Sequence, residues 1–201
     1  MKARLTPALF AHAEQALSQV LRFEHPADAV VSRYFHDHRE LGHADRGFVA
    51  ETLFAVLRRK RSLETRCGTA SSPRHLLLLA LVMLRGWNQR ELQPILKASE
   101  DAWLSAARGM AADDFPPAVR SDLPDWLYGA LERQFGADEV AIIACGLNQP
   151  APLDLRVNSL KTDREPLLAR LAADGIRAEA GVLAGPRQHH LDPGPRIGRA
   201  A

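Results

Sequence analysis

Residues 76–84 constrain the fold more than any other part of this chain. They read LLLLALVML, nine consecutive apolar residues that follow Ser72 and Pro73. A capping hydroxyl before a proline, whose φ already suits a helix, predicts a helix start at this point. A helix that is apolar on nearly every side must be covered by other elements, and its length is less than half of the roughly 20 residues that cross a membrane. The sequence therefore predicts a helical bundle with this segment at its centre and no membrane span.

Apolar residues also recur at helical spacing on both sides of this segment. Helix starts are predicted at Thr6–Pro7, Pro26, Asp45, Asn88, Ser99 and Pro124, and residues 140–147 form a final apolar stretch. Together they make an array of about seven helices. Residues 109–121, which contain two aspartates and two prolines, are predicted to be a linker.

The pattern changes after residue 148. Leu153, Leu155 and Val157 alternate with polar residues, which predicts a half-buried strand. Thr162 and Glu165 have the spacing of a capping box before a further helix, and a second strand could follow that helix. Residues 181–201 are rich in glycine and proline, and we predict no fold there. The predicted fold class is mainly α: a helical bundle at residues 1–148, an incomplete α/β unit at 149–180 and an unstructured tail at 181–201.

Charge is distributed unevenly, although 26 basic residues nearly balance 24 acidic ones. Residues 58–90 carry a net charge of plus seven, and residues 91–174 carry minus six. Clustered guanidinium groups can form bidentate, salt-sensitive contacts with a polyanion. The candidate RNA-binding residues are Arg58, Arg59, Lys60, Arg61, Arg66, Arg74 and Arg90, together with Arg156 and Asn158 on the predicted strand. Alternatively, cations in a last helical turn only complement the helix dipole, and the strand pair forms a solvent face.

The other reactive side chains favour structural roles. Among His36, His38 and His43, no third ligand at metal-site spacing is apparent, so no metal is predicted. His189 and His190 are interpreted in the same way. The three tryptophans could stack on bases, but their apolar neighbours favour core positions for Trp87, Trp103 and Trp126. Asp45 is interpreted as a helix cap, with Arg46 paired to a nearby carboxylate.

Cysteine use and the N-terminus predict the compartment. Cys67 and Cys145 lie far apart without Cys-x-x-Cys spacing, so neither a disulfide scaffold nor a sulfur-rich zinc site is expected. Pro7, His12 and Glu14 interrupt what would be the apolar part of a signal peptide. A cytoplasmic protein without a membrane partner is therefore predicted.

Three stretches, taken in order, resemble one family. They are residues 41–58 (LGHADRGFVAETLFAVLR), residues 123–127 (LPDWL) with Phe135 and Gly136, and residues 147–158 (LNQPAPLDLRVN). This set is similar to the N-terminal region of the RsmB, or Sun, type of ribosomal RNA cytosine-C5 methyltransferase, over about residues 5–180. The resemblance implies a NusB-like helical domain and the start of an α/β subdomain, both presenting ribosomal RNA to a catalytic domain that uses S-adenosylmethionine.

The chemistry that the resemblance implies is not matched by residues of this chain. No glycine-rich turn follows a strand, and neither cysteine stands in the Pro-Cys or Thr-Cys-Ser context of the family's nucleophile. No cofactor or catalytic role is therefore assigned, and the chain is expected to be a truncated or frame-shifted form that binds RNA without being active alone. A NusB-like adaptor for RNA and protein, without catalysis, is the main alternative, and a non-functional remnant is a third.

Overall fold

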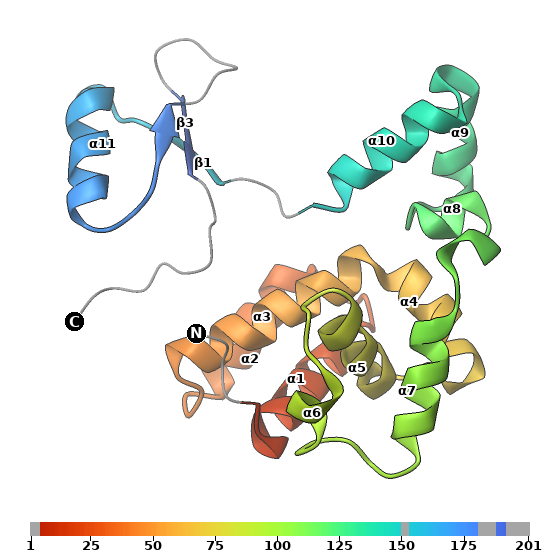
Figure 1. Cartoon of the computed structure of the whole chain (residues 1–201). Coiled ribbons are helices and arrows are strands. Elements are labelled where there is room, and N and C mark those ends of the chain that lie inside the picture. Colours follow the sequence, from red (N-terminus) through yellow and green to blue (C-terminus); the bar gives the residue numbers. More distant parts are fainter. Residues whose placement is uncertain (1–4, 150–152, 181–187, 192–201) are drawn as a thin grey trace. The chain divides into compact units, whose positions relative to one another are not determined.

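The computed structural model describes residues 5–149, 153–180 and 188–191, and it divides into two compact units, Met1–Asn148 and Gln149–Ala201. The first unit is helical and the second combines one helix with three short strands (Figure 1). This agrees with the predicted mainly α fold class. No helix among the described residues is long and apolar enough to cross a bilayer.

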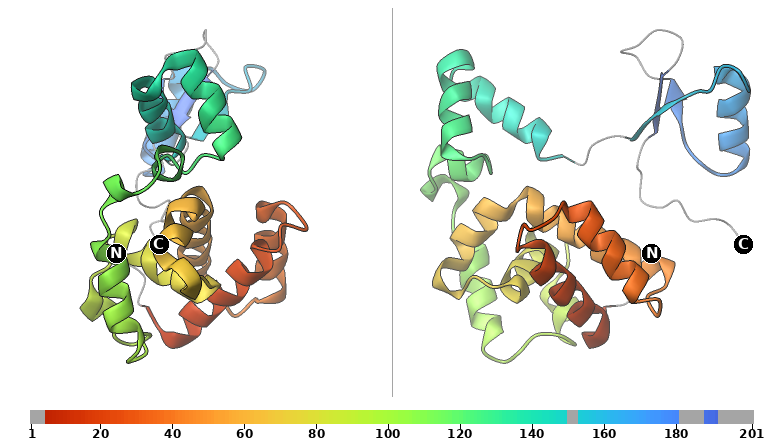
Figure 2. Two further views of the ribbon diagram at one scale, coloured as in Figure 1. Left: turned by 90° about the vertical axis from the view of Figure 1, so that its right-hand side faces the viewer. Right: turned by 180° about the vertical axis from the view of Figure 1, so that it is seen from behind.

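The helical unit contains ten α-helices within its described residues. They are α1 (Pro7–Val20), α2 (Ala27–Asp37), α3 (His43–Arg58), α4 (Lys60–Cys67), α5 (Pro73–Met83), α6 (Gln89–Leu92), α7 (Glu100–Gly109), α8 (Pro117–Arg120), α9 (Asp125–Phe135) and α10 (Ala137–Leu147). Short 3₁₀ turns at Gly68–Ala70 and Ala112–Asp114 separate some of them. Two views from other sides show the same array (Figure 2).

Helix α5 lies at the centre of this unit, as its apolar sequence predicts. Its residues 76–81 are each at most 1% exposed. It packs against α1, α3, α4 and α7, which bring their own apolar faces to it. The central position follows from composition, because a helix without a polar face is stable only where neighbours cover every side.

Local capping sets several of the helix starts. The Thr6 hydroxyl accepts a hydrogen bond from Leu9 N at 3.1 Å, and Ser72 accepts one from His75 N at 3.3 Å. Asn88 and Glu91 form a reciprocal capping box at α6. These three predicted starts are confirmed.

Two other predicted features of the helix ends are wrong. Helix α3 begins at His43 after Gly42, so Asp45 lies inside its first turn and makes no side-chain cap. Arg46 donates from Nε to the Leu41 carbonyl at 2.9 Å instead of pairing with a carboxylate. The backbone turn ahead of α3 supplies the acceptor that sequence spacing alone does not reveal.

The predicted linker at residues 109–121 is partly ordered into helix. It contains α8, and Phe115, Ala118 and Val119 are each 7% exposed. The prolines and aspartates of this stretch predict a linker. Pro117 instead occupies the first position of α8, where the φ that its ring fixes already suits a helix.

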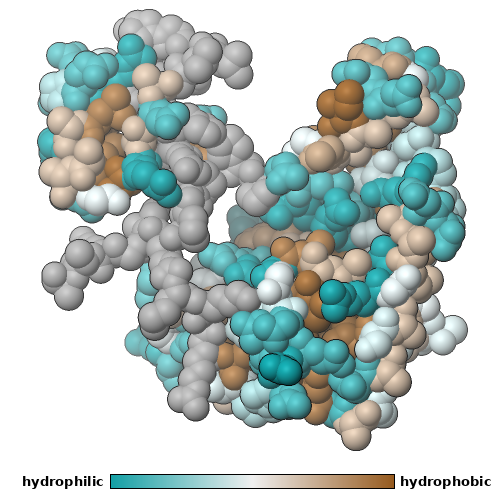
Figure 3. All heavy atoms as spheres, in the orientation of Figure 1, coloured by the Kyte–Doolittle hydropathy of each residue, from teal (hydrophilic) through white to brown (hydrophobic). Residues whose placement is uncertain are grey.

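Helices α9 and α10 form a hairpin with a small core of its own. Leu123, Val140 and Ala144 are buried in this core, against partly buried side chains of α9. Large apolar side chains on the same hairpin remain exposed: Trp126 (73%), Phe135 (46%), Ile142 (65%) and Leu147 (60%). Figure 3 shows apolar surface on this hairpin.

The α/β unit has the order β1 (Leu153–Arg156), α11 (Arg164–Ala173), β2 (Glu179–Ala180) and β3 (Gln188–Leu191). The sheet order is β1-β3-β2, and β3 pairs antiparallel with both neighbours, Leu153 opposite Leu191 and Ala180 opposite His189. The predicted strand, helix and second strand are therefore present.

Two details of this unit differ from the sequence expectation. The prediction of no fold in residues 181–201 is wrong for 188–191, which form the middle strand; the rest of that stretch lies outside the described residues. Strand pairing joins segments about 35 positions apart, which local periodicity cannot detect. The predicted Thr162 capping box is also absent, because α11 begins after Asp163 without a side-chain cap.

Candidate nucleic-acid interface

The start of α4 carries the basic run, and it is capped from a distant part of the chain. The residue at its N-cap is Arg59, whose side chain offers no acceptor. Asp122 supplies the acceptor instead: its carboxylate accepts from Ser62 N at 2.7 Å and from Ser62 Oγ at 2.9 Å. Arg59 Nε lies 3.0 Å from the same carboxylate. Asp122 therefore caps the first turn of α4 from a position 60 residues further along the chain.

Asp122 is held in an unusual environment. Its side chain is 1% exposed and its backbone adopts a φ of 54°, in the left-handed region that non-glycine residues rarely occupy. Burial raises the pKa of this carboxyl, and the Ser62 N–H and the Arg59 charge oppose that rise. The Ser62 and Arg59 contacts are therefore what make a carboxylate tolerable at this buried position.

Lys60 and Arg61, which follow Arg59 on α4, are also paired within the chain. Lys60 Nζ lies 2.6 Å from Glu64 one turn along α4. Arg61 donates to the Leu123 carbonyl and, at 2.5 Å, to Asp125. Arg59 and Arg61 thus join α4 to the segment that leads into α9, a role that sequence reasoning did not assign.

Arg66 and Arg74 are held more tightly still. Arg66 donates to the carbonyls of Ala107 and Met110 at 3.2 and 2.6 Å, and its guanidinium lies 4.8 Å from the centre of the Phe115 ring. Arg74 forms a two-point contact with Glu100, at 2.5 and 2.8 Å, with side chains 15% and 6% exposed. RNA contact by these two arginines stays a prediction, but their structural partners already account for their positions.

Three of the candidate cations remain available. Arg58 at the end of α3, Arg90 on α6 and Arg156 on β1 make no ion pair with an acidic residue in the described part of the chain. Arg90 and Arg156 are exposed and Arg58 is half-buried. Asn158 follows β1 and accepts from Leu160 N at 3.1 Å, which shapes the turn while leaving its amide N–H groups exposed.

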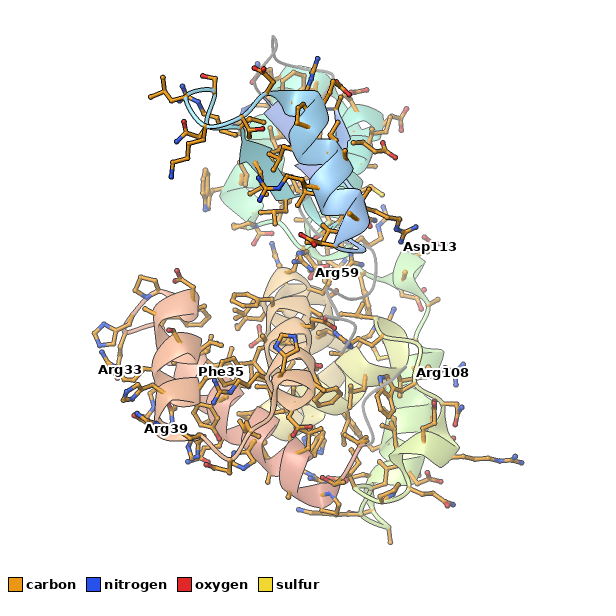
Figure 4. All side chains as sticks on the ribbon, turned by 90° about the vertical axis from the view of Figure 1, so that its left-hand side faces the viewer. Arg33, Phe35, Arg39, Arg59, Arg108 and Asp113 are labelled. Atoms are coloured by element: carbon orange, nitrogen blue, oxygen red, sulfur yellow. The ribbon has the colours of Figure 1, made fainter. Side chains whose placement is uncertain are left out.

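Arg33 and Arg39, which are not among the cations predicted to bind RNA, are exposed on α2 and the turn after it. Figure 4 shows both at the α2 side of the helical unit, with Arg108 on the opposite side and Arg59 between them. Exposed positive charge is therefore spread around the helical unit and not concentrated on α4. The polar spacing of α2 was the signal that could have identified these residues.

Tryptophan and cysteine placements test further expectations. Trp87 is buried and Trp103 half-buried, as predicted, but the core prediction for Trp126 is wrong because this side chain is 73% exposed on α9. Cys67 is buried, and burial raises the pKa of its thiol to about 12, so it is not a nucleophile at neutral pH. Cys145 is exposed on α10.

The turns among the described residues do not fit a nucleoside cofactor. A methyl-donor site of the Rossmann kind needs a glycine-rich turn between a strand and a helix. The turn between β1 and α11 covers residues 157–163 and contains no glycine. We therefore derive no cofactor chemistry from these residues.

The fold defines a protein in which a helical unit with many arginines precedes a small antiparallel α/β unit. Residues 123–185 match the ferredoxin-like domain of RsmF/B-like methyltransferases. No curated protein matches the chain significantly. The match begins at Leu123, whose carbonyl accepts from Arg61 and which follows Asp122. The matched segment therefore begins where this part of the chain contacts α4.

Proposed function

We propose that this chain is the RNA-recognition portion of an S-adenosylmethionine-dependent ribosomal RNA cytosine-C5 methyltransferase. The family match over residues 123–185 is the observation that carries this proposal. In this proposal the described residues bind RNA, and methyl transfer is performed by a catalytic part that they do not include. The cytoplasm is the proposed compartment, which the two free cysteines support.

The exposed cations supply the chemistry that RNA binding needs. Arg58, Arg90 and Arg156 have guanidinium groups that no described carboxylate neutralises, and each can donate hydrogen bonds to a phosphate. Trp126 adds an exposed indole within the matched segment, and aromatic faces of this kind stack on unpaired bases. Electrostatic contact to the backbone together with stacking is the usual basis of binding to structured RNA with single-stranded loops.

A salt titration tests this proposal on the whole chain. The probe is a fluorescent ribosomal RNA stem–loop, and binding is followed by anisotropy between low and physiological salt. The variant Arg58→Gln/Arg90→Gln/Arg156→Gln should bind more weakly, and its log–log salt slope should fall by about 2, because each lost phosphate contact changes the slope by about 0.7 on single-stranded regions.

The matched control removes three exposed arginines from elsewhere, Arg22→Gln/Arg108→Gln/Arg133→Gln, and should keep most of the slope. Equal slopes for the two variants would show that only net charge matters and would exclude a defined interface. Arg59 and Arg61 are unsuitable for this test, because their substitution also breaks the contacts to Asp122 and Asp125.

The second candidate is a NusB-like adaptor that binds RNA and protein without catalytic ancestry. The large helical unit is the observation that favours it. The matched segment includes β1, α11 and β2 of the α/β unit, and this argues for the methyltransferase proposal, because an adaptor has no need of such a unit. Incubation with labelled S-adenosylmethionine and ribosomal RNA should give no methyl transfer by this chain, and transfer would overturn the division between binding and catalysis.

A further inference from the structure

Three metal-ligating side chains meet at one edge of the helical unit. His12 comes from the middle of α1, His38 follows the last residue of α2, and Glu40 lies in the turn before α3. Their nearest ligand atoms all lie within 4.8 Å of one another. Within this cluster His38 Nδ1 is 2.9 Å and His12 Nε2 is 3.7 Å from the same Glu40 oxygen.

The spacing of His36, His38 and His43 predicts no metal site, because the sequence shows no third ligand near them. In the structure His36 pairs with Asp37 at 3.2 Å and is not part of the cluster. The second imidazole beside His38 comes from His12. The contact between α1 and α2 brings His12 to His38, 26 positions later in the chain. Such a set of ligands is visible only once two helices pack together.

The hydrogen bonds behind His12 determine which of its nitrogens is free. Tyr34 donates its hydroxyl proton to Gln15 Oε1 at 3.1 Å, so its oxygen acts as the acceptor toward His12 Nδ1 at 2.9 Å. Nδ1 of the neutral ring therefore carries the proton, and Nε2 presents its lone pair toward Glu40. An orienting hydrogen bond to the non-ligating nitrogen is the usual arrangement of a metal-bound histidine.

The lone pair of His12 Nε2 and the carboxylate of Glu40 repel each other unless a metal ion, or a proton on Nε2, lies between them. The rings of His12 and His38 meet edge to face with centroids 5.0 Å apart, and Tyr34 packs against His38 at 4.2 Å. The buried Tyr34 therefore orients the two imidazoles, whereas the Glu40 carboxylate is exposed.

We propose that His12 Nε2, His38 Nδ1 and Glu40 Oε1 bind a divalent transition metal ion of the Zn²⁺ type, with water in the fourth position. Tetrahedral Zn²⁺ with ligand distances of about 2.0–2.1 Å places its donor atoms about 3.3 Å apart. The separations from Glu40 Oε1 to the two imidazole nitrogens, 2.9 and 3.7 Å, bracket that value, and all three donor atoms lie within 4.8 Å of one another. The bound ion ties the C-terminal end of α2 and the following turn to α1.

Cobalt(II) is the probe, because tetrahedral coordination gives an intense visible absorption that octahedral solvated cobalt lacks. The whole chain is stripped with a chelator and titrated with Co²⁺, followed by competition with Zn²⁺. One equivalent should produce the tetrahedral spectrum. The variants His12→Gln, His38→Gln and Glu40→Gln should each abolish that spectrum and weaken Zn²⁺ binding at least about tenfold, whereas His36→Gln and His43→Gln should leave both unchanged.

A further variant tests the orienting hydrogen bond. Tyr34→Phe keeps the ring but removes the hydroxyl that accepts from His12, and should weaken Zn²⁺ binding by about tenfold while the metal-free chain keeps its helical circular dichroism. Metal should raise the melting temperature of the native chain but not of His12→Gln.

Binding that survives in His12→Gln and Glu40→Gln would place the metal elsewhere, for example at His189 and His190, and overturn the proposal. A Co²⁺ titration without the tetrahedral absorption would also overturn the proposal. In that case a proton on His12 Nε2, and not a metal ion, would lie between His12 and Glu40.

Discussion

In the helical unit the leucines of α5 are at most 1% exposed, whereas Leu153 and Leu155 of β1 are 48% and 41% exposed. Both segments are apolar enough to form a core, but only the first has helices on every side. Among the placed side chains of the α/β unit, only Val157 is buried. Three short strands and one helix enclose too little volume for a core of their own. Among the described side chains, the buried apolar surface that stabilises the fold therefore lies mainly in the helical unit.

The largest expected effect comes from the core of α5. Leu79→Ala should lower the free energy of unfolding by about 3–4 kcal/mol, because it leaves a cavity among fully buried neighbours. Leu155→Ala on β1 should cost less than about 1 kcal/mol. Urea unfolding followed by helical circular dichroism measures both, and equal losses would contradict the comparison.

The next effect concerns the buried ion pair between α5 and α7. Arg74→Gln should cost about 3 kcal/mol, because it leaves the Glu100 carboxylate buried with its main partner removed. The matched control is Arg85→Gln, whose partner Glu51 is 66% exposed, and it should cost less than about 1 kcal/mol. Similar losses of unfolding free energy in the two variants would mean that burial does not make the Arg74–Glu100 pair contribute more than the Arg85–Glu51 pair.

The same pair sets a pH dependence. The pKa of Glu100 is lowered, first by its hydrogen bond from Arg74. Its contribution to stability is therefore present above the ordinary glutamate pKa of about 4.3 and lost as the pH falls through the lowered folded value. Glu100→Gln should flatten this part of the stability profile in urea unfolding between pH 7 and pH 3, and an unchanged acid slope would argue against the pair.

The smallest of these effects concerns the junction at which the family domain begins. Asp122→Ala removes the acceptor at the first turn of α4 and should cost about 2 kcal/mol. Asp122→Asn should cost less, because an amide oxygen still accepts from Ser62. Asp125→Ala is the control, since its side chain is 80% exposed, and it should fall below about 1 kcal/mol in the same unfolding assay.

The helix starts at Thr6, Ser72 and Asn88 and the apolar core of α5 could all be predicted, because each depends on residues within one or two turns of each other. The candidate site could be predicted only as a set of charges. Which arginines are paired depends on carboxylates such as Asp122 and Glu100, which lie tens of positions away. Trp126 was misplaced for the same reason, since its apolar neighbours in sequence do not form its surroundings in space.

The sequence alone therefore determined the helical character, the central helix and the similarity of residues 123–185 to the RsmF/B-like ferredoxin-like domain. Tertiary structure decided that β3 completes the small sheet, that Asp122 caps α4 and that His12 joins His38 and Glu40. The physical reason is range: hydrophobic spacing and capping act between close neighbours in the chain, whereas strand pairing, buried charge pairs and metal ligands require segments that only packing brings together.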